Sequence, residues 1–434
     1  MEISYLYQLF LECGTICTDT RNIVEGSLFF ALKGESFNGN QFACEALDKG
    51  CRYAIVDEKQ FVSSERIHFV DDSLVTLQQL ARYHRQRLNI PIIGITGSNG
   101  KTTTKELLKA VLSAKYNVYA TKGNLNNHIG VPLSLLSIEK NIEIGIIEMG
   151  ANHIGEIKIL SEIAEPNYGI ITNVGKAHIE GFGSFEGIKK GKGELYDFLS
   201  KNGGRIIFNA ENIHLNEMLK NKSCEKIPYG RGEEMVINGI DYTVNPFLSV
   251  KLKIKGNKES LTVQTRLVGD YNFENVLAAF TFGYLFKVSP EEMKKSVEQY
   301  VPSNNRSQLI KTSKNKVLVD CYNANPDSMK VAIENFITLK DEQKVIILGD
   351  MLELGDHSKE EHAKIIELIS SFTGNLKSYL VGDIFSNINK NKEIICFLTV
   401  EDLVNHLRKN NIKGAFVLLK GSRKLKLERL IDEL

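Results

Sequence analysis

Short apolar runs alternate with helical patterns over most of this chain, and this rhythm restricts the folds open to it. The first apolar runs cover residues 92–95, 142–147, 168–172 and 205–209, with helical patterns at 106–112 and 154–163 among them. Strands that alternate with helices form βαβ units, whose parallel sheet is buried on both faces. The alternation resumes later with apolar runs at 317–319, 345–348, 378–381, 394–398 and 415–419. The sequence therefore predicts an α/β protein with two parallel sheets.

Two breaks in this pattern predict where the domains meet. The chain has 434 residues, enough for about three domains of roughly 150 residues each. A helical pattern that ends near residue 84 is followed by Pro91, and a turn-rich stretch covers 301–305. We expect a small α/β domain at 1–88 with strands near 27–32 and 52–56, a central domain at 89–300 and a C-terminal domain at 301–434.

The composition excludes several classes of protein. Hydrophobic residues at 42% and charged residues at 25% are typical of folded chains. The 54 basic and 53 acidic residues leave a formal charge of +1, so we expect no nucleic-acid partner. The sequence shows no basic leader and no run of 18 apolar residues, which predicts neither export nor a membrane span. Seven cysteines without a C-x-x-C pair predict reduced thiols, so we expect a cytoplasmic protein. We also expect the protein to be a monomer.

A glycine-rich loop follows the first strand of the central region. It comprises Gly97, Ser98, Asn99, Gly100, Lys101, Thr102 and Thr103. In such loops backbone N–H groups surround phosphate oxygens, the lysine reaches the terminal phosphates, and the threonine binds Mg²⁺. The usual spacing would require glycine at position 95, where this chain has isoleucine. A plain glycine-rich turn is the alternative, but the order strand, loop and helix favours ATP binding.

Two polar side chains follow later strands of the same predicted sheet. Glu148 follows the run at 142–147, and His178 comes after the strand at 168–172. Because the carboxyl ends of neighbouring parallel strands border one crevice, both side chains can reach a nucleotide there, and Glu148 is a candidate Mg²⁺ ligand. Without the loop they would be interpreted as a surface carboxylate and an ordinary histidine. Lys192 lies in a basic run typical of a solvated helix face, which by itself assigns it no role.

Together these motifs resemble the Mur ligases, ATP-dependent amide-forming enzymes of peptidoglycan synthesis. The stretches that carry the resemblance are residues 97–104, 148–152, 172–178 and 192–194. Other stretches resemble the family members that join D-alanyl-D-alanine to UDP-N-acetylmuramoyl-tripeptide, namely residues 124–132, 320–329, 348–355 and 419–423. Residues 18–21 and 34–40 are similar to the family's UDP-binding domain, so the resemblance covers nearly the whole chain.

The resemblance implies a role for each domain and for individual residues. The N-terminal domain would bind the UDP-sugar, the central domain ATP, and a Rossmann-like C-terminal domain would close over the nucleotide. Two Mg²⁺ ions are implied, one held by Thr102 and Glu148 and one by His178 and a carbamylated Lys192. The implied catalytic residues are Lys101, His178 and Lys192. Further nucleotide contacts are implied for Asn272, Asn275, Arg306 and Asp320. Substrate contacts are implied for Asp19, Thr20, Arg21, Asn126, Asn127, Tyr322, Asn323 and Asn325.

The implied reaction activates the terminal carboxylate of the tripeptide with the γ-phosphoryl group of ATP, giving an acyl phosphate. The dipeptide amine then attacks, phosphate leaves, and UDP-N-acetylmuramoyl-pentapeptide forms. Lys101 and Mg²⁺ would neutralise the charge that develops. Two alternatives stay open: a related ligase that adds a single amino acid or acts on folates, and a regulatory module that only switches conformation on binding ATP. Phosphate release that depends on the acceptor distinguishes the three.

Overall fold

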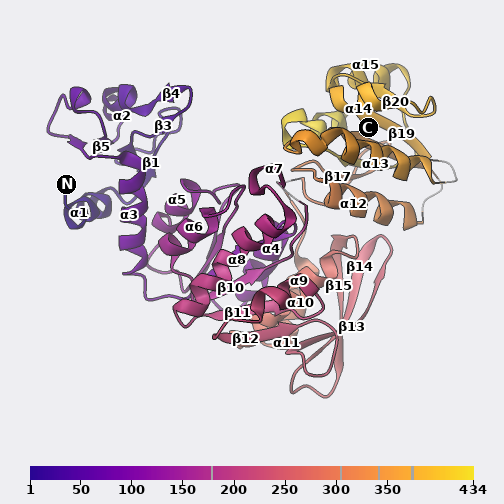
Figure 1. Cartoon of the computed structure of the whole chain (residues 1–434), viewed down its shortest axis with the longest axis horizontal. Helices are drawn as coiled ribbons and strands as arrows, with labels where there is room; N and C mark the ends of the chain where they lie inside the picture. Colours follow the sequence, from indigo (N-terminus) through magenta and orange to yellow (C-terminus); the bar gives the residue numbers. More distant parts are fainter. Residues whose placement is uncertain (177–178, 304, 341–342, 373–375) are drawn as a thin grey trace.

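The computed structural model of the chain describes residues 1–176, 179–303, 305–340, 343–372 and 376–434. Three regions follow one another along the chain, from the indigo N-terminal part through the magenta centre to the yellow C-terminal part (Figure 1). In the described part of the chain, no helix is both long and apolar enough to cross a membrane.

The N-terminal region contains a four-stranded parallel sheet with the order β1-β2-β5-β6. Its strands are β1 (Ile16–Cys17), β2 (Leu28–Phe30), β5 (Tyr53–Val56) and β6 (Ile67–Phe69). A small hairpin follows β2, formed by β3 (Lys33–Gly34) and β4 (Phe37–Asn38). The helices of this region are α1 (Ile3–Cys13), α2 (Ala43–Asp48) and α3 (Ser73–Arg85). All three residues of β2 are buried, which makes this strand the centre of the small core.

Helix α3 joins this region to the central one. It packs against α5 (Gly130–Leu136) and α6 (Glu156–Ala164) of the central region as well as against α1. Arg85, at its end, is buried and donates hydrogen bonds to the carbonyl oxygens of Ala164 and Glu165, at 2.9 and 3.0 Å. Because a buried guanidinium needs such partners, these bonds tie α3 to the central region.

The central region is a six-stranded, entirely parallel sheet with the order β12-β11-β10-β7-β9-β8. Its strands are β7 (Ile92–Thr96), β8 (Val118–Ala120), β9 (Ile144–Glu148), β10 (Tyr168–Ile171), β11 (Arg205–Asn209) and β12 (Glu225–Tyr229). Both neighbours of β7 come later in the chain and lie on opposite sides of it, so the connections leave β7 in different directions. Ligands of such sheets bind beyond the carboxyl ends of the strands at this switch point.

Helices cover both faces of the central sheet. One face packs against α5, α6 and α8 (Phe185–Lys201), and the other against α4 (Lys101–Leu112) and α10 (Asn272–Leu285). Neighbouring isoleucines of β7 contribute to different clusters, Ile92 to the first and Ile93 to the second. Side chains alternate in this way along a strand, which explains why the strands are continuous apolar runs. The remaining helices are α7 (Ile179–Phe182), α9 (Ile213–Leu219) and α11 (Pro290–Gln299).

Three antiparallel strands extend the central region towards the C-terminal one. They are β13 (Ile237–Val244), β14 (Phe247–Ile254) and β15 (Ser260–Val268). Alternate residues of β14 are buried, and these lie against α10 and neighbouring strands. Figure 1 shows this sheet beneath the C-terminal region.

The C-terminal region holds a second six-stranded sheet with the order β16-β17-β21-β18-β19-β20. Only β16 is antiparallel to its neighbour, and the other strands are parallel. The strands are β16 (Gln308–Lys311), β17 (Lys316–Asp320), β18 (Lys344–Gly349), β19 (Leu376–Val381), β20 (Ile395–Phe397) and β21 (Phe416–Lys420). The helices are α12 (Pro326–Thr338), α13 (Ser358–Ser370), α14 (Asp383–Ile388) and α15 (Val400–Lys409).

The predicted α/β class with parallel sheets is confirmed. Every apolar run that we expected to be a strand overlaps a strand of the sheets. The antiparallel sheet β13–β15 was not predicted, although residues 247–254 alternate between apolar and polar side chains. The predicted domain boundaries fall in the connections between α3 and β7 and between α11 and β16.

Candidate active site

The glycine-rich loop runs from the end of β7 to the start of α4. Gly97 has φ +146°, and a Cβ at this position would lie 2.0 Å from Oγ1 of Thr172, so a larger residue does not fit. Gly100 has φ +79° and immediately precedes α4. The two glycines let the loop turn sharply against the end of β10. The N-terminus of α4 therefore faces the space beyond the sheet, where its free N–H groups attract anions.

Residues after β10 hold the loop in this shape. The N–H of Asn99 donates to Oδ1 of Asn173 at 2.9 Å, and Oγ1 of Thr172 donates to the carbonyl oxygen of Asn99 at 2.6 Å. The Ser98 hydroxyl donates to the carbonyl oxygen of Gly175 at 2.9 Å and accepts from its N–H at the same distance. These hydrogen bonds hold the glycine-rich loop, here named the phosphate loop, in its shape.

Lys101 folds back over the loop. Its Nζ donates to the carbonyl oxygens of Gly97 and Ser98, at 2.6 and 3.1 Å. Burial lowers the pKa of Lys101 to about 8, an effect that the nearby Glu148 carboxylate opposes and the Arg306 charge adds to. A phosphate bound at this loop would place a negative charge beside the Lys101 amine.

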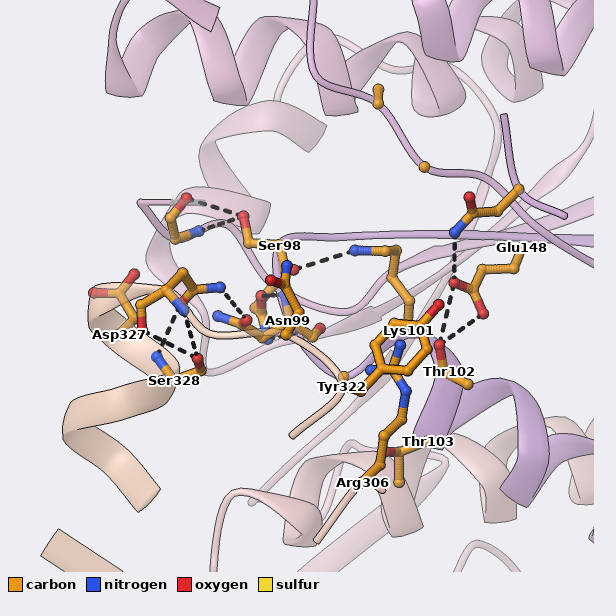
Figure 2. A pocket seen from close by; sticks show the side chains of 18 of the residues that line it. Ser98, Asn99, Lys101, Thr102, Thr103, Glu148, Arg306, Tyr322, Asp327 and Ser328 are labelled. Carbon is orange, nitrogen blue, oxygen red and sulfur yellow. Dashed lines mark hydrogen bonds between the residues drawn. The ribbon is translucent and has the colours of Figure 1, made fainter. Parts of the chain in front are cut away.

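Thr102 and Glu148 face each other at the carboxyl end of the sheet (Figure 2). The Thr102 hydroxyl is 2.9 Å from Oε2 and 3.2 Å from Oε1 of Glu148, and both residues are buried. Asn126 donates from Nδ2 to Oε1 of the same carboxylate at 2.9 Å. A hydroxyl and a carboxylate beside a phosphate loop are oxygen ligands of the kind that Mg²⁺ prefers.

Lys192 lies on α8, and its side chain is completely buried. Burial, together with the smaller effect of the Lys101 charge, lowers the pKa of Lys192 to about 7. Its Nζ lies 5.3 Å from the centre of the Phe182 ring. The expectation of a solvated lysine, which followed from the composition of the run, is wrong because the helix turns this residue towards the sheet. His178, the predicted companion of Lys192, lies outside the described residues.

The C-terminal region closes directly over the phosphate loop. Asn325, which caps the N-terminus of α12, donates from Nδ2 to Oδ1 of Asn99 at 2.8 Å. Two residues further on, Oδ2 of Asp327 accepts the N–H of Lys176 at 2.7 Å. Figure 2 shows Asp327 and Ser328 opposite Ser98 and Asn99. The two regions thus meet through polar contacts at the phosphate loop and at residue 176.

Arg306 reaches the cavity from the segment before β16. Its guanidinium carbon lies 3.7 Å from the centre of the Tyr322 ring, and that of Arg423 lies 4.8 Å from the same ring. Asp320, at the end of β17, forms an ion pair with Lys420 and accepts the N–H of Ser307 at 3.2 Å. Arg306 and Lys420 of the C-terminal region thus line the same cavity as the phosphate loop.

A cavity of about 920 Å³ lies between the central region and the C-terminal region. Sixteen of the predicted site residues line it, namely Ser98, Asn99, Gly100, Lys101, Thr102, Thr103, Asn126, Asn127, Glu148, Asn272, Asn275, Arg306, Asp320, Tyr322, Asn323 and Asn325. Its described lining does not include Gly97, Lys192, Asp19, Thr20 or Arg21.

Asn272 and Asn275 lie at the start of α10, and Asn275 contacts the first turn of α4. Asn275 accepts the Thr104 hydroxyl at 3.0 Å through Oδ1 and donates to Oδ1 of Asn272, also at 3.0 Å. Asn272 donates in turn to the carbonyl oxygen of Val268 at 2.9 Å. Their side-chain amides are therefore engaged within the protein, although both residues also line the cavity.

The predicted UDP contacts lie in the N-terminal region, on the connection between β1 and β2. Asp19 and Arg21 form an ion pair at 2.7 Å. The hydrogen bond from Arg21 lowers the pKa of Asp19 to about 2. The structure does not bring this loop to the cavity.

Several residues that line the cavity were not predicted individually, among them Asn173, Asp327 and Lys420. Asn173 and Lys420 each stand directly after or at the end of a predicted strand, so the rule that placed Glu148 could have found them. Asp327 is the second residue of α12, and only the fold brings it to residue 176.

Comparison with known proteins identifies the family. The family model described as "Mur ligase middle domain" matches residues 95–283, and "Mur ligase, glutamate ligase domain" matches residues 305–423. The UDP-N-acetylmuramoyl-tripeptide–D-alanyl-D-alanine ligase of Bacillus subtilis is 35% identical over 96% of this chain and 92% of the relative. The enzyme of that name from Haemophilus influenzae is also 35% identical, over 96% and 93% of the two chains.

Solved structures agree with the sequence relatives. A crystal structure of MurF from Acinetobacter baumannii has a TM-score of 0.86 at 30% identity, covering 98% of this chain and 97% of the other. MurF ligase of Thermotoga maritima, solved with ADP, has a TM-score of 0.85 at 28% identity with the same coverage. The chain therefore belongs to the Mur ligase family, among the UDP-N-acetylmuramoyl-tripeptide–D-alanyl-D-alanine ligases.

Proposed function

We propose that this enzyme uses ATP to join the terminal carboxylate of UDP-N-acetylmuramoyl-tripeptide to the amine of D-alanyl-D-alanine. The observation that carries the proposal is the cavity of about 920 Å³ that the phosphate loop and the C-terminal sheet enclose together. The nucleotide would bind at the wall formed by the phosphate loop, and the second substrate would lie against the opposite wall. The relatives that match nearly the whole chain are named for this reaction.

The phosphate loop would hold ATP with its γ-phosphoryl group beside Lys101. The tripeptide carboxylate attacks phosphorus, the bond to the β-phosphate oxygen breaks, and ADP and an acyl phosphate result. Two anions must approach each other for this step, so its barrier is largely electrostatic. The Nζ group of Lys101 would exchange its hydrogen bonds to two backbone carbonyls for hydrogen bonds to the phosphate. Arg306 would add a second positive charge from the other side.

Thr102 and Glu148 are the proposed ligands of one Mg²⁺ ion. Their oxygens already lie next to each other, and the Asn126 hydrogen bond keeps the carboxylate turned towards Thr102. Mg²⁺ would neutralise negative charge on the phosphate oxygens when bound.

Lys192 is proposed to become a carbamate. At a pKa of about 7, roughly half of the Lys192 amine is unprotonated at neutral pH. Its nitrogen attacks the carbon of CO₂, a proton is released, and a carbamate remains whose single negative charge is shared by two oxygens. The modification turns a buried cation that Lys101 repels into an anion that Lys101 attracts. With His178, this carbamate would hold the second metal ion.

In the second half of the reaction the dipeptide amine, once deprotonated, attacks the acyl carbon, and phosphate leaves. We place the dipeptide against Tyr322, Asn323 and Asn325 of the C-terminal region. Asn127 is proposed to contact the tripeptide, and residues 19–21 the uridine diphosphate. Closure of the C-terminal region over the loop excludes water, which would otherwise hydrolyse the acyl phosphate.

All of these groups come from one chain, so the proposed working unit is a monomer. All seven cysteines are free thiols, in keeping with a proposed site of action in the reducing cytoplasm.

Phosphate release from ATP and Mg²⁺ tests the proposed function. The assay contains UDP-N-acetylmuramoyl-tripeptide, and D-alanyl-D-alanine is added or left out while the pentapeptide is followed by mass. We expect both products to require the dipeptide. Turnover with D-alanine alone or with glutamate, and none with the dipeptide, would contradict the substrate assignment.

A further inference from the structure

Lys105 is a buried cation that the proposed reaction does not use. It lies on α4, one turn after Lys101, and only 1% of its side chain is exposed. Its Nζ donates to the carbonyl oxygen of Thr121 at 2.6 Å and lies 3.0 Å from Oε1 of Glu106. Burying an ammonium group is costly even when it is paired, so its presence beside the active site calls for a reason.

The active-site carboxylate of Glu148 lies close to this lysine. Nζ of Lys105 is 3.8 Å from Oε2 of Glu148, and the two side chains are 1% and 2% exposed. This distance exceeds that of a hydrogen bond, so Lys105 does not orient the carboxylate. Its influence on Glu148 is that of a nearby positive charge, which acts strongly where water is excluded.

Other groups fix the position of Glu148. Thr102 and Asn126 contact its carboxylate, and its backbone N–H donates to Oγ1 of Thr121 at 3.0 Å. Thr121 is itself held, because its N–H donates to the carbonyl oxygen of Ile146 in β9 at 2.9 Å. Removing the charge of Lys105 would therefore leave the carboxylate where it is.

We propose that Lys105 weakens the binding of Mg²⁺ at Glu148, so that the ion leaves with the nucleotide after each turnover. The lysine and the metal ion compete for the same negative charge, and they repel each other. The inference rests on the proposed function, because it takes Glu148 to be a metal ligand. Lys105 acts through Glu148 and does not touch a substrate.

Direct metal binding tests this proposal. Lys105→Met removes the charge and keeps the length of the side chain, Lys105→Arg keeps the charge, and Lys109→Met is the matched control on the exposed side of α4. Mn²⁺ replaces Mg²⁺, and its free concentration is measured by electron paramagnetic resonance with β,γ-methylene-ATP present. We expect Lys105→Met to lower the Kd for Mn²⁺ on the order of tenfold. The other two variants should keep the wild-type Kd.

The direction of the change separates charge from structure. A lysine that only supported the fold would weaken metal binding when replaced, so an unchanged or higher Kd in Lys105→Met overturns the proposal. If that variant does not fold, as judged by its melting curve, Glu106→Gln decides. It removes the carboxylate that partly neutralises Lys105, so the Kd should rise, and an unchanged Kd overturns the proposal.

Glu148→Gln distinguishes the failure of this inference from that of the proposed metal site. Loss of Mn²⁺ binding in Glu148→Gln together with tighter binding in Lys105→Met supports both. Loss of binding in Glu148→Gln with no change in Lys105→Met overturns the role of Lys105 alone. Wild-type binding in Glu148→Gln overturns the metal site and, with it, the role of Lys105.

Discussion

Replacing Lys192 with methionine should stabilise the folded enzyme at neutral pH while it abolishes activity. The pKa of the Lys192 amine is about 7 in the folded protein, against 10.5 for an ordinary lysine. The difference, 10.5 minus 7, is 3.5, and at about 1.4 kcal/mol for each unit of pKa it costs the folded state about 5 kcal/mol. Methionine has a similar shape and no charge, so it removes this cost.

The pH dependence follows from proton binding. The unfolded chain binds the Lys192 proton more tightly than the folded one, so stability rises with pH between 7 and 10.5. The cost is complete below pH 7 and disappears above pH 10.5. The advantage of Lys192→Met should therefore be about 5 kcal/mol at pH 6 and about 2 kcal/mol at pH 9.

Denaturant unfolding in CO₂-depleted buffer measures this difference. Wild type, Lys192→Met and the exposed control Lys190→Met are compared at pH 6, 7.5 and 9, using the transition that unfolds the central region. Added bicarbonate should stabilise the wild type and leave Lys192→Met unchanged, because only the wild type forms a carbamate. A Lys192→Met variant that is less stable than wild type at pH 6, or an advantage that does not change with pH, would refute the reasoning.

Three further outcomes follow from the geometry. Lys101→Met should lower the rate of phosphate release by at least about a hundredfold while the UDP-sugar still binds, as calorimetry would show; near-normal release would remove Lys101 from phosphoryl transfer. Gly97→Ala should lose nucleotide binding and melt at a lower temperature, because its Cβ would lie 2.0 Å from Oγ1 of Thr172. The control Gly203→Ala has no atom within 4 Å of the new Cβ, so it should lower the free energy of unfolding by only about 1 kcal/mol. Equal melting curves for the two variants would contradict the steric account. Asn325→Ala removes a hydrogen bond between the C-terminal region and the phosphate loop, so it should lower kcat several-fold and shift small-angle scattering towards a more open molecule; an unchanged scattering curve would argue against this contact.

The sequence was most informative where one chemical requirement dominates. Strands buried on both faces must be apolar throughout, which is why the runs at 92–95 and 142–147 marked β7 and β9. Glycine at 97 and 100 and lysine at 101 predicted the loop, because few other residues can form that turn. The strand-end rule then brought Glu148 to the cavity.

Long-range packing accounts for what sequence reasoning missed. Lys192 lies in a run of lysines and glycines that is typical of an exposed face, and only the approach of α8 to the central sheet buries it. Lys105 is equally inconspicuous, since its hydrogen-bond partner Thr121 lies directly after β8, sixteen residues further along the chain. The antiparallel strands β13–β15 follow a different periodicity from the rest of the chain, so the alternation of strands and helices gave no indication of them.

Isotope transfer tests the proposed ligase reaction most directly. The tripeptide substrate carries ¹⁸O in both oxygens of its terminal carboxylate, and it is converted with ATP and D-alanyl-D-alanine while phosphate and peptide are analysed by mass. An acyl phosphate requires one labelled oxygen to leave with the phosphate and the other to remain in the new amide. We predict one ¹⁸O in each released phosphate and one in each pentapeptide. Phosphate without label, released at the rate of product formation, would contradict activation of the carboxylate by ATP.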